Sequence, residues 1–157
     1  MYDELYDDLL AAMEPLARVR QDRRYHPEGD ALFHSLQVFD LALAANEPPH
    51  VVAAALFHDI GKAEVEGPHE VAGADRLADV ADERTLWLVA QHMDLLRDPR
   101  AHLGDPRREE LARLRAYDDR GRAVHARVTP LERALGIALE PGFAEGWLDE
   151  SHHLTES

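Results

Sequence analysis

Several side chains that bind metals occupy positions that a folded helix would bury. His34 lies one helical turn before Val38, and Asp118 lies one turn after Leu114, so each polar group shares a face with apolar residues. A carboxylate that faces a core is costly unless a cation or a hydrogen-bond donor accompanies it. A lone buried histidine is usually satisfied by a backbone carbonyl, but His34 and Asp118 together favour a bound cation.

The pair His58-Asp59 ends the most apolar segment of the chain. Residues 51–57 are apolar on every helical face, so this helix is predicted to be central and buried. An ionised aspartate at its end requires a partner. Two interpretations remain open: His58 and Asp59 pair with each other at the helix end, or both bind a metal.

Two further histidines extend this set. His92 has Leu88 and Leu96 one turn away on either side, and His69 follows Pro68 at a predicted helix start. The chain has no cysteine, so a metal would be bound by His, Asp, Glu and water. Imidazole and carboxylate ligands suit Fe, Mn, Ni, Zn and Co ions. We therefore predict one or two divalent transition metal ions, whose identity the sequence leaves open.

The elements that position these residues are predicted to be helices throughout. Apolar residues recur with helical periodicity, strand signals are poor, and glycine, proline and asparagine mark the helix ends. Helices are expected at about residues 3–19, 32–45, 50–59, 69–80, 83–96, 107–120 and 130–139. A chain of 157 residues fits one domain, so we expect a single compact all-α bundle over residues 1–157.

The charge of the chain limits its partners. The formal net charge is −14, which repels polyanions, so extended nucleic-acid binding is not expected. One cationic pocket would still accept a small phosphorylated substrate, and Lys62 is the only lysine among 17 basic residues. No signal peptide or bilayer-length apolar run is indicated, so we expect a cytoplasmic protein without membrane association. A homodimer is compatible with the helical faces.

The order of these residues resembles that of the HD-domain metal-dependent phosphohydrolases. His58-Asp59-Ile60-Gly61-Lys62 is similar to that family's His-Asp-x-Gly-Lys motif. Segments 25–36, 69–74 and 118–122 further resemble the HD domain of bacterial CCA-adding tRNA nucleotidyltransferases. The resemblance covers about residues 20–122, and residues 123–157 are interpreted as a C-terminal extension. No segment resembles the nucleotidyltransferase domain of those enzymes, so CCA addition is not expected.

The resemblance implies roles for individual residues. His34, His58, Asp59 and Asp118 would hold a first metal, and His69 and His92 would hold a second one that shares Asp59. Asp59 and Lys62 are the catalytic candidates, with Lys62 neutralising a phosphate oxygen. Substrate binding is assigned to Lys62, His26, Arg24, Arg120 and Arg122, although either of the last two would also suit the C-terminal end of a helix.

The activity implied is hydrolysis of phosphomonoesters or 2′,3′-cyclic phosphates on nucleotides or RNA ends. One alternative is a di-iron HD-type oxygenase of a small alcohol or phosphonate, since its ligand set is similar. Another is a metal-binding module that senses a nucleotide without turnover. A purely structural helical domain is disfavoured, because it would leave the buried carboxylates of Asp59 and Asp118 without partners.

Overall fold

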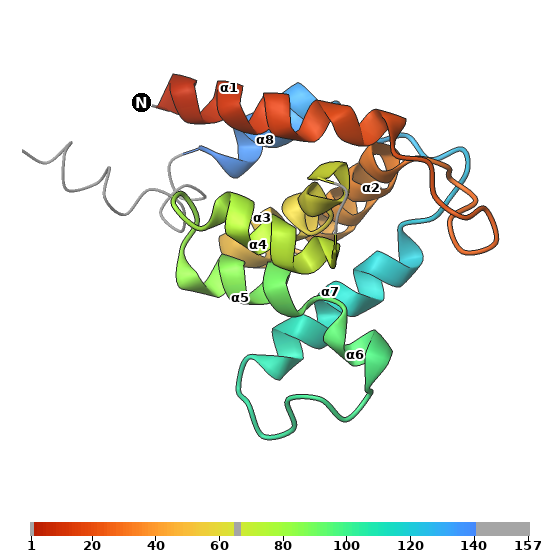
Figure 1. The fold of residues 1–157 in the computed structure, drawn as a ribbon, viewed down its shortest axis with the longest axis vertical. Helices are drawn as coiled ribbons and strands as arrows, with labels where there is room; N and C mark the ends of the chain where they lie inside the picture. Colours follow the sequence, from red (N-terminus) through yellow and green to blue (C-terminus); the bar gives the residue numbers. More distant parts are fainter. Residues whose placement is uncertain (1, 65–66, 141–157) are drawn as a thin grey trace, which may run out of the picture.

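The computed structural model describes residues 2–64 and 67–140, which form a bundle of helices (Figure 1). The elements, in chain order, are α1 (Tyr2–Met13), η1 (Glu14–Arg18), α2 (Ala31–Ala44), α3 (Pro49–Phe57), η2 (Ile60–Glu64), α4 (His69–Leu77), α5 (Glu83–Gln91), α6 (Asp94–Arg97), α7 (Arg108–Arg120) and α8 (Leu131–Ala138). Among the described residues the one β pairing is an isolated bridge between Arg20 and Asp30. The prediction of an all-α fold is confirmed.

Helix α3 is the centre of the bundle, as its uniformly apolar sequence predicts. Every residue from His50 to Phe57 is buried, and α3 contacts α2, α5, α7 and α8. Phe57 of α3 is fully buried, as are Phe39 of α2 and Leu88 of α5. Helices α2 and α7, which carry predicted ligands, and helix α5, which ends just before His92, therefore pack on this buried helix. The predicted ligand pair His58-Asp59 follows directly after it.

N-cap side chains fix where two of the helices begin. The Asp30 side chain accepts a hydrogen bond of 2.8 Å from the backbone N–H of Phe33 at the start of α2. Asp82 caps α5 in the same way through the N–H of Thr85, at 2.9 Å. Both are N-cap residues that satisfy a backbone donor with no intrahelical partner. These caps fix where α2 and α5 begin, and so which faces carry His34 and His92.

Two predicted helices are each interrupted once. The expected helix over 3–19 is α-helical only to Met13 and continues as the 3-10 turn η1, because Pro15 lacks an N–H and its ring disfavours an α-helix before it. The expected helix over 83–96 ends at Gln91, and α6 starts at Asp94. Between them, the His92 ring donates a hydrogen bond to the carbonyl oxygen of Val89. In an uninterrupted helix that carbonyl would accept from a backbone N–H instead.

Helix α8 joins the described part of the predicted C-terminal extension to the same core. Leu131, Ala134 and Leu135 are buried, and α8 packs on α1 and α3. Residues 141–157, which include Trp147 and the pair His152-His153, lie outside the described residues. Within the described ranges, none of the helices has the length and apolar character required to span a bilayer.

A close glycine contact sets the distance between η2 and α4. A Cβ atom added at Gly61 would lie 2.0 Å from the carbonyl oxygen of His69 and 2.6 Å from the backbone nitrogen of Gly73. Both atoms belong to backbone, which cannot move aside as a flexible side chain can. Gly61 therefore allows η2 to lie directly against the first turn of α4, which brings Asp59 and Lys62 close to His69.

We expect Gly61→Ala to destabilise the protein by about 2–3 kcal/mol, because overpacking against backbone forces α4 away from η2. Gly136→Ala is the matched control, since a Cβ at Gly136 in α8 meets nothing within 4 Å. In a helix that substitution should stabilise by about 0.5–1 kcal/mol. Chemical denaturation of both variants measures the difference. Equal stabilities for the two variants would contradict the close contact.

Candidate metal centre

Five parts of the fold contribute the six predicted metal ligands to one buried cluster. The ligands are His34 from α2, His58 and Asp59 from the junction of α3 and η2, His69 from the start of α4, His92 just after α5, and Asp118 from the last turn of α7. All except His69 are buried, and the His69 side chain is 20% exposed. The structure thus brings together all six residues singled out from the sequence.

In the first group of predicted ligands, two histidines face one oxygen of Asp118 and one oxygen of Asp59. Nε2 of His34 lies 2.7 Å from Oδ1 of Asp118 and 3.9 Å from Oδ2 of Asp59. Nε2 of His58 lies 3.5 Å from the same Asp118 oxygen and 3.3 Å from the same Asp59 oxygen. Oδ2 of Asp118 instead pairs with the guanidinium of Arg115 at 2.8 Å, which fixes the orientation of the carboxylate.

The second group gathers at the other oxygen of Asp59. Oδ1 of Asp59 lies 3.2 Å from Nε2 of His69 and 3.5 Å from Nε2 of His92. These two nitrogens are 3.0 Å apart. Asp59 therefore directs one oxygen to each group of histidines, which is the arrangement that a carboxylate bridging two cations requires.

Backbone carbonyls set the tautomers of three of these histidines. Nδ1 of His34, His58 and His92 lies 2.8 Å from the carbonyl oxygens of Gly121, Ala55 and Val89, respectively. A carbonyl oxygen only accepts, so each Nδ1 must carry the proton. A neutral ring then presents the lone pair of Nε2 to the cluster, as a metal ligand does.

When the rings are neutral, those lone pairs face acceptors, an arrangement that a cation between them would stabilise. Nε2 of His34 points at a carboxylate oxygen, Nε2 of His69 lies beside Nε2 of His92, and Nε2 of His58 is buried with no hydrogen-bond partner. Acceptors facing acceptors in a buried site are unfavourable unless protons or metal ions neutralise them. The donor set, all imidazole nitrogen and carboxylate oxygen, fits a divalent transition metal.

The electrostatics of the cluster favour positive charge within it. Burial opposes a charged His58 ring, but the carboxylates of Asp59 and Asp118 outweigh it and raise the pKa of His58 to about 10. Burial also opposes charge on Asp59, but the neighbouring histidines, chiefly His58, hold its pKa well below the usual range. Burial lowers the pKa of His92 despite a hydrogen bond to Asp59, which favours the neutral ring. The carboxylates stay ionised and attract positive charge into the cluster.

Lys62 lies on the partly exposed side of the cluster. Its ammonium is 3.2 Å from Oδ2 of Asp59 and donates a hydrogen bond to the side-chain oxygen of Gln21. The Lys62 side chain is 21% exposed, similar to that of His69. Since the other predicted ligands are buried, Lys62 and His69 mark the side of the cluster that solvent reaches.

Glu28 is a site residue that sequence reasoning missed. Its side chain is fully buried, and Oε2 lies 3.0 Å from Nδ1 of His34 and 3.0 Å from Nδ1 of His26. Burial raises the pKa of Glu28, but the two histidine contacts outweigh this and keep the pKa below its usual value. A carboxylate behind a metal-binding imidazole orients the ring and strengthens it as a ligand. Residue 28 lies within the segment that resembles the HD domain, but that resemblance gave it no role, and the connector before α2 has no helical periodicity that would indicate its burial.

We expect Glu28→Gln to weaken Zn²⁺ binding by roughly 10–100-fold, because the neutral amide no longer strengthens His34 as a ligand. Competition with a chromogenic chelator measures the affinity. Glu64→Gln is the matched control, since this substitution removes the same charge from an exposed position. If both variants bound Zn²⁺ as the unaltered protein does, Glu28 would have no role behind His34.

The predicted substrate-binding residues lie at different distances from the cluster. His26 contacts Glu28, and its ring centroid is 5.1 Å from that of His34. Arg24 is 78% exposed and pairs with Asp22 in its own loop. Arg120 is exposed and makes no described ion pair. Arg122 donates to the carbonyl oxygen of Asp118 at 3.2 Å, so the helix-end contact predicted for one of the last two arginines is made by Arg122.

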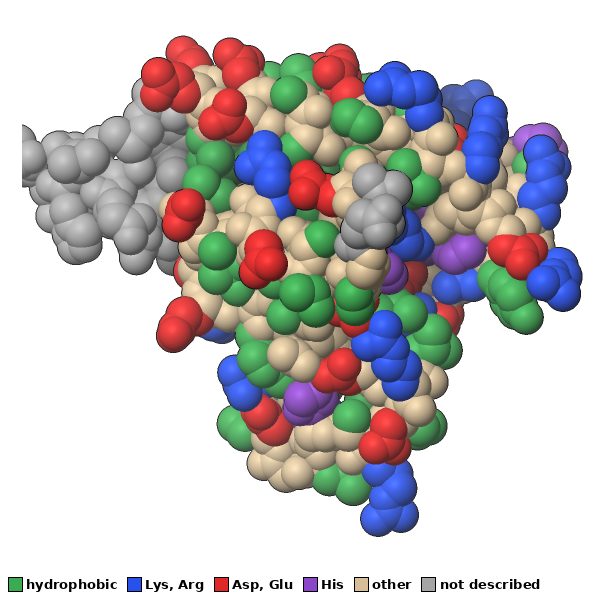
Figure 2. Space-filling model, in the orientation of Figure 1, with side chains coloured by type: hydrophobic (Ala, Val, Ile, Leu, Met, Phe, Trp, Pro, Cys, Tyr) green, Lys and Arg blue, Asp and Glu red, His purple; other side chains and the backbone are tan. Residues whose placement is uncertain are grey.

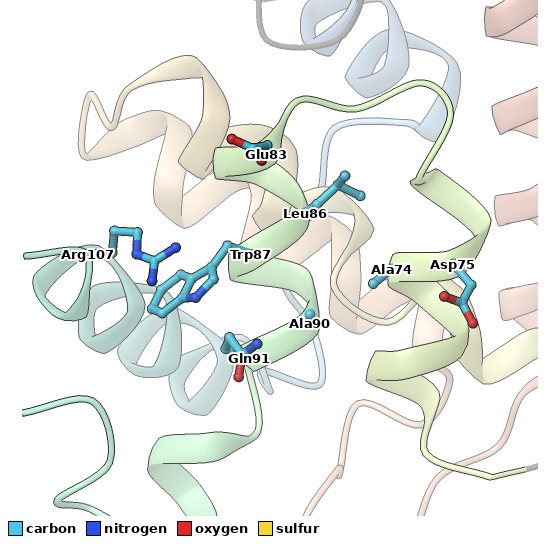
Figure 3. Close-up of a pocket in the computed structure, with 8 residues that line it drawn as sticks. All are labelled: Ala74, Asp75, Glu83, Leu86, Trp87, Ala90, Gln91 and Arg107. Atoms are coloured by element: carbon cyan, nitrogen blue, oxygen red, sulfur yellow. The ribbon is translucent and has the colours of Figure 1, made fainter. Parts of the chain in front are cut away.

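A separate pocket lies between α4 and α5, away from these ligands (Figure 3). It has a volume of about 390 Å³, and none of the six predicted ligands lines it. Figure 3 shows the Arg107 guanidinium against the ring of Trp87, and its Cζ is 4.1 Å from the ring centroid. That cation–π contact closes one side of the pocket. This pocket therefore lacks the metal-binding side chains that the cluster brings together.

Comparison with known families agrees with this geometry. Residues 32–127 match the HD domain family, a span that includes all six predicted ligands and Lys62. The chain belongs to the HD domain family. HD domains form a superfamily of metal-dependent phosphohydrolases that bind divalent metals, so the family resemblance noted in the sequence is confirmed. Glu28 and His26 precede the matched span.

The HD domain of this chain is also similar to parts of larger proteins. It is 33% identical over 114 residues to the multifunctional CCA protein of Nitrosococcus oceani, which covers 64% of this chain and 26% of the relative. It is 38% identical over 74 residues to the multifunctional CCA protein of Halorhodospira halophila, a match that covers 43% of this chain and 18% of the relative. The chain thus matches about a quarter or less of the length of these relatives.

Proposed function

We propose that this HD domain hydrolyses phosphomonoesters or 2′,3′-cyclic phosphates of nucleotides or RNA ends, with one or two divalent metal ions. The observation that carries the proposal is Asp59, whose two oxygens face two separate groups of histidine nitrogens. An ammonium lies directly beside this carboxylate. A bridged cation site with an adjacent positive charge suits the stabilisation of a phosphoryl group.

Each residue then has a defined task. His34, His58, Asp59 and Asp118 would hold one ion, and His69, His92 and Asp59 would hold the other. Bound divalent ions supply Lewis acidity toward a phosphoryl oxygen and lower the pKa of water to about 7. Lys62 binds a phosphate oxygen and offsets the charge that develops there. Gln21 orients the Lys62 ammonium through its side-chain oxygen.

Metal analysis combined with an activity panel tests the proposal. Untagged protein is analysed for metals and assayed against 2′,3′-cyclic nucleotides and nucleoside monophosphates, before and after removal of metal by a chelator. We expect bound transition metal, loss of hydrolysis on its removal, and recovery when Mn²⁺, Ni²⁺, Co²⁺, Zn²⁺ or anaerobic Fe²⁺ is returned. Asp59→Ala should lose metal and hydrolysis together, because both groups of histidines share its carboxylate.

The same experiment separates the alternatives. Redox-active iron with oxygen consumption and no hydrolysis would replace the proposal with the oxygenase. Bound metal and nucleotide without turnover under any metal would replace it with a sensing module. If the chain bound no metal even after reconstitution, the centre itself would be disproved.

A further inference from the structure

Arginine residues are concentrated in two short segments of this acidic chain. Residues 18–24 and 120–127 hold seven of the 17 basic residues and only one of the 31 acidic ones. We call these two segments the basic rim. The net charge of −14 therefore does not describe these two segments, in which basic residues outnumber acidic ones. In Figure 2 several Lys and Arg side chains gather at the upper right, and acidic side chains line α1 at the upper left.

Both segments of the basic rim are attached to the metal centre. The guanidinium of Arg122 donates to the carbonyl oxygen of Tyr25 at 2.6 Å and so joins the second segment to the connector that follows the first. Gly121 accepts from the His34 ring, and Gln21 accepts from Lys62. The rim thus contacts a predicted metal ligand on one side and the candidate phosphate-binding lysine on the other.

Most guanidinium groups of the rim are free to bind a ligand. Five of the seven arginines are exposed, and their side chains make no described hydrogen bond or ion pair; these are Arg18, Arg20, Arg23, Arg120 and Arg127. Like charges held together without acidic partners repel one another, and a polyanion relieves that repulsion. Tyr25, at the edge of the first segment, is 61% exposed and offers a ring face for stacking.

We propose that the basic rim binds the phosphodiester backbone of a single-stranded polynucleotide whose phosphorylated end enters the metal centre. The inference rests on the proposed function and specifies its substrate as a polynucleotide end. Arginines and an exposed aromatic ring are the groups that bind single strands without sequence preference. A duplex would not fit, because the ligands are buried and only a flexible end reaches them past Lys62 and His69.

An anionic lipid surface shares the phosphate chemistry but fits the rim less well. Of the large apolar side chains that are exposed in the described residues, only Tyr25 and Val124 lie in or beside the rim. Interfacial binding to a bilayer requires a continuous apolar face, which two separate side chains do not provide. A polynucleotide is therefore the partner that the basic rim fits better.

Fluorescence anisotropy with a labelled oligouridylate of about 12 nucleotides that ends in a 3′-hydroxyl tests the proposal. The protein is used with its bound metal, and affinity is measured over a series of KCl concentrations. We expect Arg23→Ala/Arg127→Ala, one change in each segment, to weaken binding by roughly tenfold and to reduce the salt slope by about 1.4. Tyr25→Ser should weaken binding about fivefold with the slope unchanged, since stacking releases no counterions.

Arg76→Ala/Arg133→Ala is the matched control, because it removes the same charge from exposed positions on α4 and α8. Equal weakening by both double variants would overturn the proposal, as would no binding at low salt. Tighter binding to phosphatidylserine vesicles than to the oligonucleotide would also overturn it and assign the rim to lipid. Hydrolysis of small phosphoesters by the unaltered protein decides the proposed function separately, so the two ideas fail on different measurements.

Discussion

Asp118→Asn is expected to lose bound metal and to lower phosphoester hydrolysis by about a thousandfold or more, whereas Asp119→Asn is expected to retain both within about twofold. The two carboxylates are neighbours in α7 but face different surroundings. Oδ1 of Asp118 lies within 3.5 Å of Nε2 of both His34 and His58. Asp119 is exposed, so solvent screens its ion pairs with Arg115 and Arg122 and these contribute little.

The pair of variants is informative because each one removes the same charge from the same turn of the same helix. Elemental analysis and hydrolysis of a 2′,3′-cyclic nucleotide measure the two losses. Circular dichroism confirms that Asp118→Asn still folds, and Arg115 keeps Asp119 as a partner in that variant. Full metal content in Asp118→Asn, or equal losses in both variants, would remove Asp118 from the ligand set.

Helical periodicity is the reason that much of this centre could be predicted. His34, His92 and Asp118 each share a helical face with apolar residues, and a helix that buries such a face must bury the polar group as well. The side chain of each of these residues is buried in the structure. Helix starts were also predictable, since Asp30 and Asp82 are N-cap residue types that bond to the first turn.

Residues outside the helices were not predictable in the same way. Glu28 lies in a connector where no period relates one side chain to the next, so its burial depends on the tertiary position of His34. The same limit applies to Arg24, whose local partner Asp22 holds the side chain along its own loop. The position of Arg115 against Asp118 depends on the geometry within one turn, which a pattern of apolar residues does not specify.

The distribution of charge is the other property that composition conceals. A net charge of −14 predicts a polyanion-repelling surface only if charge is spread evenly. The contact between Arg122 and Tyr25 instead brings together two basic segments that are nearly a hundred residues apart in the chain. Contacts of this kind form only in the folded chain, so the local field at the metal centre follows from the fold and not from the composition.

Lys62→Met is expected to lower kcat by roughly 100–1,000-fold while leaving the metal content unchanged. Lys62 is not one of the six predicted ligands, and its ammonium instead lies 3.2 Å from Oδ2 of Asp59 at the exposed side of the cluster. Methionine retains much of the apolar stem but cannot offset charge on a phosphate oxygen. Single-turnover hydrolysis of a 2′,3′-cyclic nucleotide and elemental analysis measure the two quantities.

Lys62→Arg tests whether positive charge alone is sufficient. A planar guanidinium is larger than an ammonium and directs its donors in a fixed fork, whereas Asp59 and Gln21 hold a compact point charge. We therefore expect this variant to remain at least about tenfold slower than the unaltered protein. Full activity in Lys62→Arg would reduce the role of position 62 to charge alone. Loss of metal in Lys62→Met would instead show that Lys62 acts by holding Asp59 in place, and the phosphate-binding role would be withdrawn.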